Sequence, residues 1–178
     1  MSKKVRFAIV GTGVIAPLHA ESIIKNPLTE LVAVCDIIEE KAQAFADKYG
    51  VEHVYKYYED MFKRGDIDVV CVCTPSGNHG EVTIAAAEAG IHVLCEKPIE
   101  ITDEKLTAMI DACRKHGVKL GGIFQRRTLP AAIKTREAIQ SGKLGKMVLG
   151  DAYLKYYRSP EYYKSAGWRG TWELDGGG

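Results

Sequence analysis

The fold is decided by the stretch Val5-Arg6-Phe7-Ala8-Ile9-Val10-Gly11-Thr12-Gly13-Val14-Ile15-Ala16. Its first half is a short run that is apolar on both faces, which is typical of a central strand in a parallel sheet. The two glycines then predict a tight turn, and a helix follows over about residues 14–25. The chain therefore begins with the strand, turn and helix of an α/β unit.

The same alternation continues to residue 124. Strand patterns recur at residues 31–35, 53–55, 67–73, 92–95 and 119–124, and helical patterns lie between them. Because strands that alternate with helices pair in parallel, we predict an α/β fold. Its core is a doubly wound parallel Rossmann sheet with helices on both faces.

The pattern changes after Phe124. A helix is predicted over Pro130–Gln140, and Lys146–Tyr157 has the pattern of a long strand that is more polar on one face. We therefore assign residues 1–124 to a nucleotide-binding Rossmann domain. Residues 125–178 are assigned to the beginning of an α+β domain with a mostly antiparallel sheet. One strand cannot bury its own apolar face, so we expect this to be a truncated chain.

The composition excludes several classes of protein. Of 178 residues, 46% are hydrophobic and 26% are charged, which fits neither disorder nor a membrane protein. The net charge of +1 and the scattered basic residues make nucleic acid an unsuitable partner. The five cysteines lie mostly in apolar strand patterns without C-x-x-C spacing. This favours buried, reduced thiols in a cytoplasmic protein over disulfides or a metal site.

A nucleotide site is indicated by the form G-x-G-x-x-A at residues 11–16. Gly11 permits the tight turn, Gly13 lets the backbone approach a pyrophosphate, and the small Ala16 packs the helix against the strand. Backbone N–H groups at the helix start, around Val14 and Ile15, then hold the phosphates. Any strand-glycine-helix turn can imitate this motif, so the strand before it and the helix after it carry much of the argument.

Asp36 lies at the end of the second predicted strand and supports the interpretation of the glycine turn as a nucleotide site. A carboxylate there accepts hydrogen bonds from the adenosine ribose hydroxyls. A 2′-phosphate ~4 Å away would be repelled by about 4 kcal/mol at an effective dielectric constant of about 20. The next residue is Ile37 rather than an arginine, although Lys41 is able to swing toward the same place. We therefore predict NAD as the cofactor, with NADP disfavoured.

The run Glu96-Lys97-Pro98 follows the apolar strand pattern His92–Cys95. Open α/β sheets place ligands at the carboxyl ends of their strands, so Lys97 faces solvent and substrate rather than the core. A partly desolvated lysine exchanges a proton readily with a hydroxyl. The alternatives are a solvated lysine and a trans proline that simply ends the strand.

Four motifs together resemble those of the glucose-fructose oxidoreductase and inositol dehydrogenase family, often called Gfo/Idh/MocA. They are the glycine turn, Asp36, the run Cys73-Thr74-Pro75-Ser76-Gly77-Asn78-His79, and Glu96-Lys97-Pro98. The resemblance covers the whole chain. It implies a dehydrogenase in which Lys97 is catalytic, beside the nicotinamide and the substrate hydroxyl, while Glu96 borders the nicotinamide ribose. It also suggests a cis Lys97-Pro98 peptide.

Several further residues are assigned with alternatives. Thr74, Pro75, Asn78 and His79 are expected to line the cofactor, but Asn78 serves equally well as a helix cap and His79 as a first-turn residue. His19 is read as a polar residue packed under the cofactor loop. Gln125 is placed against the nicotinamide.

Arginines and aromatic residues supply the expected substrate contacts. Arg127 resembles an arginine of family members, and its guanidinium suits a forked pair of hydrogen bonds to substrate oxygens. Two adjacent arginines point opposite ways in an extended chain, so only one of Arg126 and Arg127 is expected to enter the site. The other substrate candidates form a sugar-binding lip or, equally, a core edge of the second domain: Tyr156, Arg158, Trp168 and Arg169.

This last stretch resembles sugar-nucleotide dehydrogenases that oxidise a UDP-linked N-acetylated glucuronate at C3. Family members continue past a glycine-rich run like Asp175–Gly178 into a segment whose aspartate or asparagine and histidine complete the proton relay. That segment is missing from this sequence. The resemblance implies a homo-oligomer for the complete protein and a sugar, sugar nucleotide or cyclitol as substrate. Alternatives are a noncatalytic NAD-binding module and a methyltransferase, although methyl transfer does not explain Glu96-Lys97-Pro98.

Overall fold

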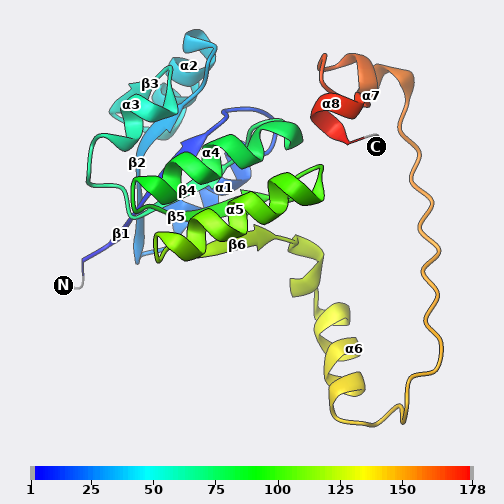
Figure 1. Cartoon of the computed structure of the whole chain (residues 1–178). Coiled ribbons are helices and arrows are strands. Elements are labelled where there is room, and N and C mark those ends of the chain that lie inside the picture. Colours follow the sequence, from blue (N-terminus) through cyan, green and yellow to red (C-terminus); the bar gives the residue numbers. More distant parts are fainter. Residues whose placement is uncertain (1–2, 177–178) are drawn as a thin grey trace. The chain divides into compact units, whose positions relative to one another are not determined.

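A computed structural model describes residues 3–176, so Gly177 and Gly178 of the glycine run lie outside the described residues. Its centre is a six-stranded sheet in the order β3-β2-β1-β4-β5-β6, in which every neighbouring pair is parallel (Figure 1). The predicted Rossmann sheet is confirmed. The strands are β1 Val5–Val10, β2 Thr29–Cys35, β3 His53–Tyr55, β4 Val69–Val72, β5 His92–Glu96 and β6 Leu120–Ile123.

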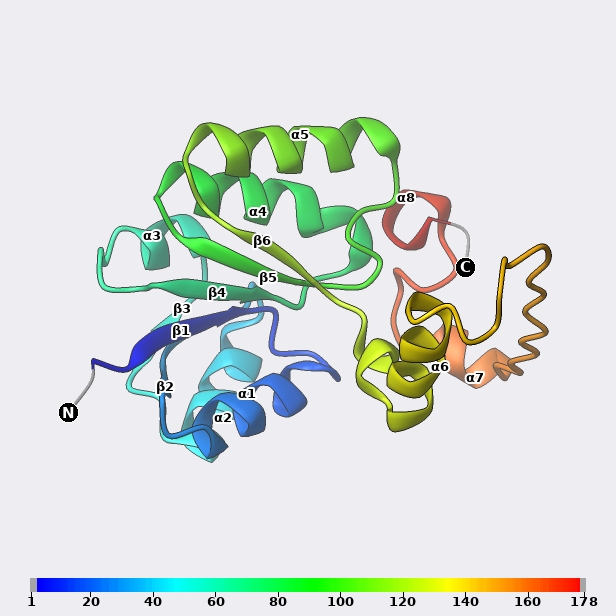
Figure 2. The ribbon, with the colours of Figure 1, turned by 90° about the horizontal axis from the view of Figure 1, so that it is seen from below.

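Helices cover both faces of this sheet. Figure 2 shows α1 and α2 on one face and α3, α4 and α5 on the other. The bounds are α1 Ala16–Lys25, α2 Glu39–Tyr49, α3 Tyr58–Phe62, α4 His79–Glu88 and α5 Asp103–Lys115, with a 3₁₀ helix η1 at Ser76–Asn78. None of the helices in the described part of the chain is long and apolar enough to cross a membrane.

The strand sequences explain why both faces are covered. Successive strand side chains point to opposite faces, so Ala8 and Val10 of β1 enter one apolar cluster and Ile9 enters the other. The first cluster packs against α4 and α5 through Val82 and Met109. Because the central strand β4, Val69–Val72, is apolar at every position, it is stable only when both faces of the sheet are buried.

The residues form two compact units, which are described separately. The second unit spans Phe124–Gly167 and contains the 3₁₀ helix η2 Gln125–Thr128, α6 Pro130–Gln140 and α7 Pro160–Lys164. The predicted strand at Lys146–Tyr157 is wrong, because these residues run without strand pairing, and the expected antiparallel sheet is not seen in residues 125–176. A strand requires partners for its backbone N–H and C=O groups, and no neighbouring strand supplies them here.

Residues 168–176 group with the first unit rather than with residues 124–167. The short helix α8 Trp172–Asp175 packs against η1. A Cβ at Gly77 would lie 2.5 Å from the carbonyl oxygen of Glu173 and 3.0 Å from the Cα of Leu174. The close approach of these two segments therefore depends on the glycine.

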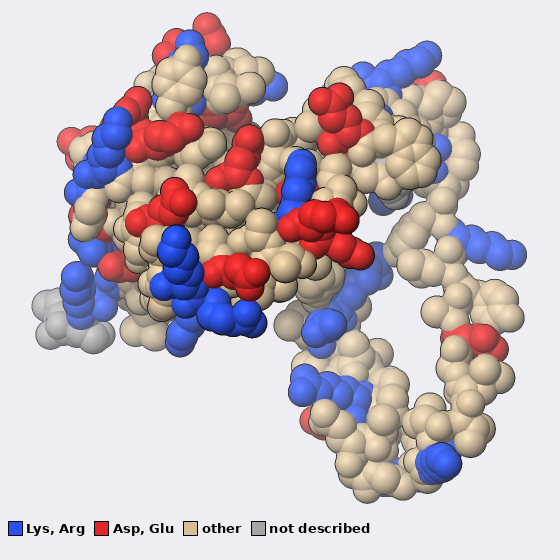
Figure 3. Space-filling view, viewed as in Figure 1, with Lys and Arg blue, Asp and Glu red and all other residues tan. Residues whose placement is uncertain are grey.

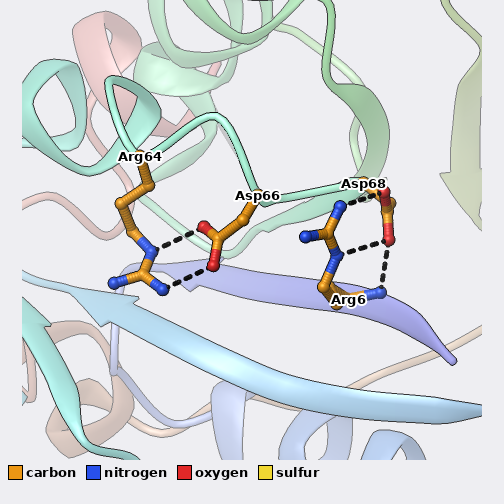
Figure 4. Close-up of polar contacts among 4 residues, drawn as sticks. All are labelled: Arg6, Arg64, Asp66 and Asp68. Carbon is orange, nitrogen blue, oxygen red and sulfur yellow. Dashed lines mark hydrogen bonds and ion pairs between the residues drawn. The ribbon is translucent and has the colours of Figure 1, made fainter.

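Figure 4 shows two arginine–aspartate pairs: Arg6–Asp68 holds the start of β1 to the chain that precedes β4, and Arg64–Asp66 lies within that preceding chain. Arg6 donates from Nε and Nη2 to both carboxylate oxygens of Asp68, at 3.1 and 2.9 Å, and its backbone N–H donates to the same carboxylate at 2.8 Å. Arg64 binds Asp66 in a similar two-pronged manner. The hydrogen bonds from Arg6 lower the pKa of Asp68 to about 2.

Substitution of Asp68 by asparagine is expected to lower the melting temperature at neutral pH by about 2–4 °C. The folded pKa lies below the unfolded value of about 3.9, so the stabilisation is present above that pH. It is lost as the pH falls through about 2. Thermal unfolding of wild type and Asp68→Asn should therefore converge between about pH 4 and pH 2. Asp111→Asn, in an exposed pair with Arg114, is the control. A pH-independent gap would contradict the assignment.

Charged side chains of both signs are mixed over the face drawn in Figure 3. Lysines and arginines lie beside aspartates and glutamates, and no broad area of one sign covers this face. This mixing agrees with the formal net charge of +1.

Candidate active site

The residues singled out from the sequence meet at the carboxyl ends of four neighbouring strands. Gly11 follows β1, Asp36 follows β2, Thr74 lies just beyond β4, and Glu96 ends β5. β1 lies beside β4 in the sheet. Successive strands are added on one side of this pair from β1 to β3 and on the other side from β4 to β6, so the order of the strands reverses between β1 and β4. Open parallel sheets form a crevice for ligands at such a switch point.

The glycine turn is shaped for close contact. Gly11 has φ +90, and its N–H donates to the carbonyl of Cys35 at 2.8 Å. A Cβ at Gly11 would lie 2.7 Å from the carbonyl carbon of Cys73, so only glycine fits. Around Gly13, by contrast, a Cβ would meet nothing within 4 Å. The turn is therefore tight on its inner side and open where a pyrophosphate would approach.

Helix α1 begins directly after this turn. Ala16 is fully buried against the sheet, as expected for the small third residue of the motif, whereas Val14 is 85% exposed. No side chain caps the helix at Ile15, the N-cap position. The first-turn N–H groups and the positive end of the helix dipole are thus suited to hold phosphate oxygens.

Asp36 is fixed beside the turn by three donors. Its Oδ2 accepts from the backbone N–H of Thr12 at 2.9 Å and from the Thr12 hydroxyl at 2.8 Å, while its Oδ1 accepts from the N–H of Ile38 at 3.0 Å. An ionised carboxylate has about four acceptor positions, so one remains for a ribose hydroxyl. The geometry fits the adenosine end of a dinucleotide.

The loop after β4 contributes an unusual polar atom. The hydroxyl oxygen of Thr74 is buried and has no hydrogen-bond partner in the described residues. Buried polar atoms nearly always have a hydrogen-bond partner. The unpaired hydroxyl of Thr74 at a ligand crevice therefore indicates that a bound ligand or a water molecule supplies the missing hydrogen bond. Pro75 precedes η1, and Asn78 stands at the N-cap position of α4 but donates to Glu81 at 3.1 Å instead of capping the helix.

The end of β5 places an acidic and a basic side chain next to each other. Glu96 is 6% exposed, whereas Lys97 is exposed, and the Lys97-Pro98 peptide is cis, as the resemblance suggested. Glu96 Oε1 lies 2.9 Å from Nε2 of His19, and Glu96 Oε2 accepts from the N–H of Lys97 at 3.1 Å. Burial raises the pKa of Glu96, but these two hydrogen bonds outweigh it and bring the net pKa below its ordinary value.

Two residues join the loops that carry these motifs, and the sequence analysis did not give either of them that role. His79 is 1% exposed, with Nδ1 2.8 Å from the carbonyl oxygen of Pro98 and Nε2 3.0 Å from that of Thr74. Glu100 accepts from the N–H of Gly80 at 2.8 Å, at the N-terminus of α4. Their first-turn and post-proline positions are common in sequences, so only the tertiary contacts reveal their function.

The remaining candidates lie in the second unit or at the end of the first. Gln125 begins η2, so the run that follows β6 is helical and the premise of an extended Arg126-Arg127 pair is wrong. Arg127 lies over the ring of Phe124 at 5.3 Å. Arg126 donates to the hydroxyl of Tyr156.

Two further arginines contact aromatic rings. Arg158 lies over the rings of Tyr162 and Tyr156 at 5.0 and 5.4 Å, within the second unit. In the first unit, Arg169 lies over Trp168 at 5.2 Å. The structure therefore brings together the cofactor candidates of the first unit. The cofactor role of Gln125 remains a prediction, as do the substrate roles of Arg127, Tyr156, Arg158, Trp168 and Arg169.

Comparison with known proteins places this site in a family. The family model described as an oxidoreductase family with an NAD-binding Rossmann fold matches residues 5–124. D-glucoside 3-dehydrogenase of Escherichia coli is 39% identical over 99% of this chain and 50% of its own length. Myo-inositol 2-dehydrogenase of Thermotoga maritima is 33% identical over 79% of this chain and 42% of its own.

Solved structures give the same result. The WlbA dehydrogenase of Bordetella pertussis, in complex with NADH and UDP-GlcNAcA, has a TM-score of 0.90 and 34% identity over 97% of this chain and 53% of that one. The Chromobacterium violaceum enzyme, with the same two ligands, has a TM-score of 0.91. The chain thus spans about half the length of the relatives it matches. On the family match and these identities, it belongs to the Gfo/Idh/MocA oxidoreductases with an NAD-binding Rossmann fold.

Proposed function

We propose that the protein is an NAD-dependent oxidoreductase that transfers hydride between the nicotinamide and a secondary hydroxyl of a sugar, sugar nucleotide or cyclitol. The observation that carries this proposal is the position of Lys97, exposed at the end of β5, two strands from the open glycine turn. The relatives support the same chemistry, because they are named as dehydrogenases of a glucoside and of inositol.

The candidate site residues of the first unit have different chemical roles in this proposal. The α1 N-terminus and the glycine turn hold the pyrophosphate, Asp36 holds the adenosine ribose, and Thr74 and Glu96 face the nicotinamide end. When bound, NAD supplies the hydride acceptor for the carbinol carbon. Lys97 takes the hydroxyl proton as that hydride leaves.

A sugar nucleotide with an acidic group is the substrate class that we favour. Both WlbA structures contain UDP-GlcNAcA, and the segment from Tyr156 to Arg169 is rich in arginine and tyrosine. Aromatic faces suit sugar rings, and guanidinium groups suit carboxylates. We propose that residues after 124 supply the side chains that contact the substrate.

The test is NADH formation at 340 nm by the complete gene product with a UDP-linked uronate, a D-glucoside and myo-inositol in parallel. Turnover of the UDP-linked uronate alone supports the favoured class. Turnover of only the glucoside or the inositol retains the dehydrogenase and rejects that class. If NADH binds and none of the three is oxidised, a noncatalytic NAD-binding module becomes the better interpretation.

The same site predicts the choice of cofactor. Wild type is expected to bind NADH at least tenfold more tightly than NADPH, because the 2′-phosphate would face Asp36. Asp36→Ala should weaken NADH and tighten NADPH, since it removes the charge and frees the N–H groups of Thr12 and Ile38. Fluorescence titration with both cofactors measures this, with Lys41→Ala as the control for a lysine that reaches the phosphate. Equal affinities in wild type would reject the assignment.

We also propose a cytoplasmic homo-oligomer. All five cysteines are free and buried, and burial raises the pKa of the Cys71 and Cys95 thiols to about 12, which suits a reducing compartment. Large apolar side chains between residues 144 and 157 are exposed, including Val148 and Tyr153 at 88% and 87%. Such side chains are normally covered by further protein surface, and light scattering of the complete protein would show whether a second copy is present.

A further inference from the structure

We propose that His19 is a positioning residue that orients the carboxylate of Glu96 toward the nicotinamide end of the cofactor. His19 lies on α1, directly behind the phosphate-binding turn, and Glu96 ends β5. In the sheet, β4 lies between β1, which leads into α1, and β5. The contact therefore links the phosphate end of the crevice to its reactive end.

The geometry is that of a buried pair with a defined direction. Nε2 of His19 lies 2.9 Å from Oε1 of Glu96, and the two side chains are 9% and 8% exposed. An ionised carboxylate only accepts hydrogen bonds, so Nε2 must carry the proton. The pair is protected from solvent, which makes its hydrogen bond stronger and more directional than a surface contact.

The second oxygen of Glu96 completes the constraint. Oε2 accepts from the N–H of Lys97 at 3.1 Å, so the carboxylate is held at both oxygens and cannot rotate freely. Loss of the His19 hydrogen bond would release one side and leave a buried charge without its main partner. The carboxylate would then turn or become protonated, and the residue beside the lysine would lose its alignment.

The inference rests on the proposed role of Glu96 at the nicotinamide ribose, and a purely structural link between α1 and β5 is the competing explanation. ADP separates the two, because it occupies only the glycine turn and Asp36, whereas NADH also reaches Glu96. His19→Leu is expected to weaken NADH binding about tenfold while ADP affinity stays within about twofold of wild type. Misalignment of this kind is expected to lower kcat/KM for NAD about 100-fold.

The experiment is fluorescence or calorimetric titration of the protein with NADH and with ADP for a small set of variants. His19→Gln, whose amide reaches the place of Nε2, should restore the affinity for NADH and leave the affinity for ADP unchanged. His19→Leu combined with Glu96→Gln should be no worse than Glu96→Gln alone, because the two residues act as one unit. Ser22→Ala, an exposed change on the same helix, is the control.

Three results would overturn the inference in distinguishable ways. If His19→Leu leaves NADH affinity unchanged while Glu96→Gln weakens it, His19 does not position Glu96. If His19→Leu weakens ADP and NADH equally, the contact is only a link between α1 and the sheet. If Glu96→Gln has no effect on NADH, the nicotinamide role of Glu96 fails first, and the role of His19 fails with it.

Discussion

Replacement of Lys97 by alanine is expected to lower kcat for hydride transfer by about 10²–10⁴-fold. The fold and the affinity for NADH should remain close to those of wild type. Lys97 is exposed at the end of β5, so its truncation removes no core packing. Its backbone N–H donates to the buried Glu96 carboxylate, and its side-chain amine, in the neutral form, is proposed to take the proton of a substrate hydroxyl.

Lys97→Arg separates proton transfer from electrostatics. Arginine retains the positive charge but does not give up its proton in proteins, so it cannot act as the base. We therefore expect Lys97→Arg to be nearly as inactive as Lys97→Ala. Lys115→Ala removes a lysine from the exposed last turn of α5 and should change nothing.

Initial rates with a substrate identified as above, together with NADH titration and a melting curve, measure each variant. The assignment would be lost if Lys97→Ala kept at least a tenth of the wild-type rate. It would also be lost if Lys97→Arg restored full activity, because a fixed positive charge would then suffice.

The fold around the cofactor candidates was predictable because it is encoded by local sequence. A strand, a glycine turn and a helix must follow one another along the chain, and Gly11, Gly13 and Ala16 have the positions that this geometry requires. Asp36 was expected at the carboxyl end of the second strand, and it directly follows β2 in the structure, while its contact with the ribose stays a prediction. The parallel sheet then brings these carboxyl ends together without further information.

Contacts between segments distant in the sequence were not predictable in the same way. His19 and Glu96 are separated by 77 positions, and no local periodicity joins them. The helical η2 was missed because Gln125–Thr128 has no strong turn signal. For the same reason, Arg126 and Arg127 were treated as part of an extended chain. Lys146–Tyr157 has a strand pattern, but strand formation depends on a partner that the described residues do not contain.

Replacement of Gly11 by alanine is expected to cause the largest loss of stability, about 3 kcal/mol or more. Two costs add at this position. The residue has φ +90, which side chains rarely adopt, and the new Cβ would lie 2.7 Å from the carbonyl carbon and oxygen of Cys73 and 2.9 Å from the N of Thr74. These are backbone atoms at the end of β4, so no flexible side chain can move aside.

Two matched glycines separate these costs from the loss of cofactor binding. Gly50→Ala has a similar positive φ of +68 but no atom within 4 Å of the new Cβ, so it should cost only about 1 kcal/mol. Gly13→Ala has open space and should leave stability nearly unchanged, yet it fills the position where the pyrophosphate approaches and should abolish NADH binding. Urea denaturation and NADH titration of the three variants give the comparison. Equal stability losses for Gly11→Ala and Gly50→Ala would show that the contact with Cys73 and Thr74 is not what requires glycine after β1.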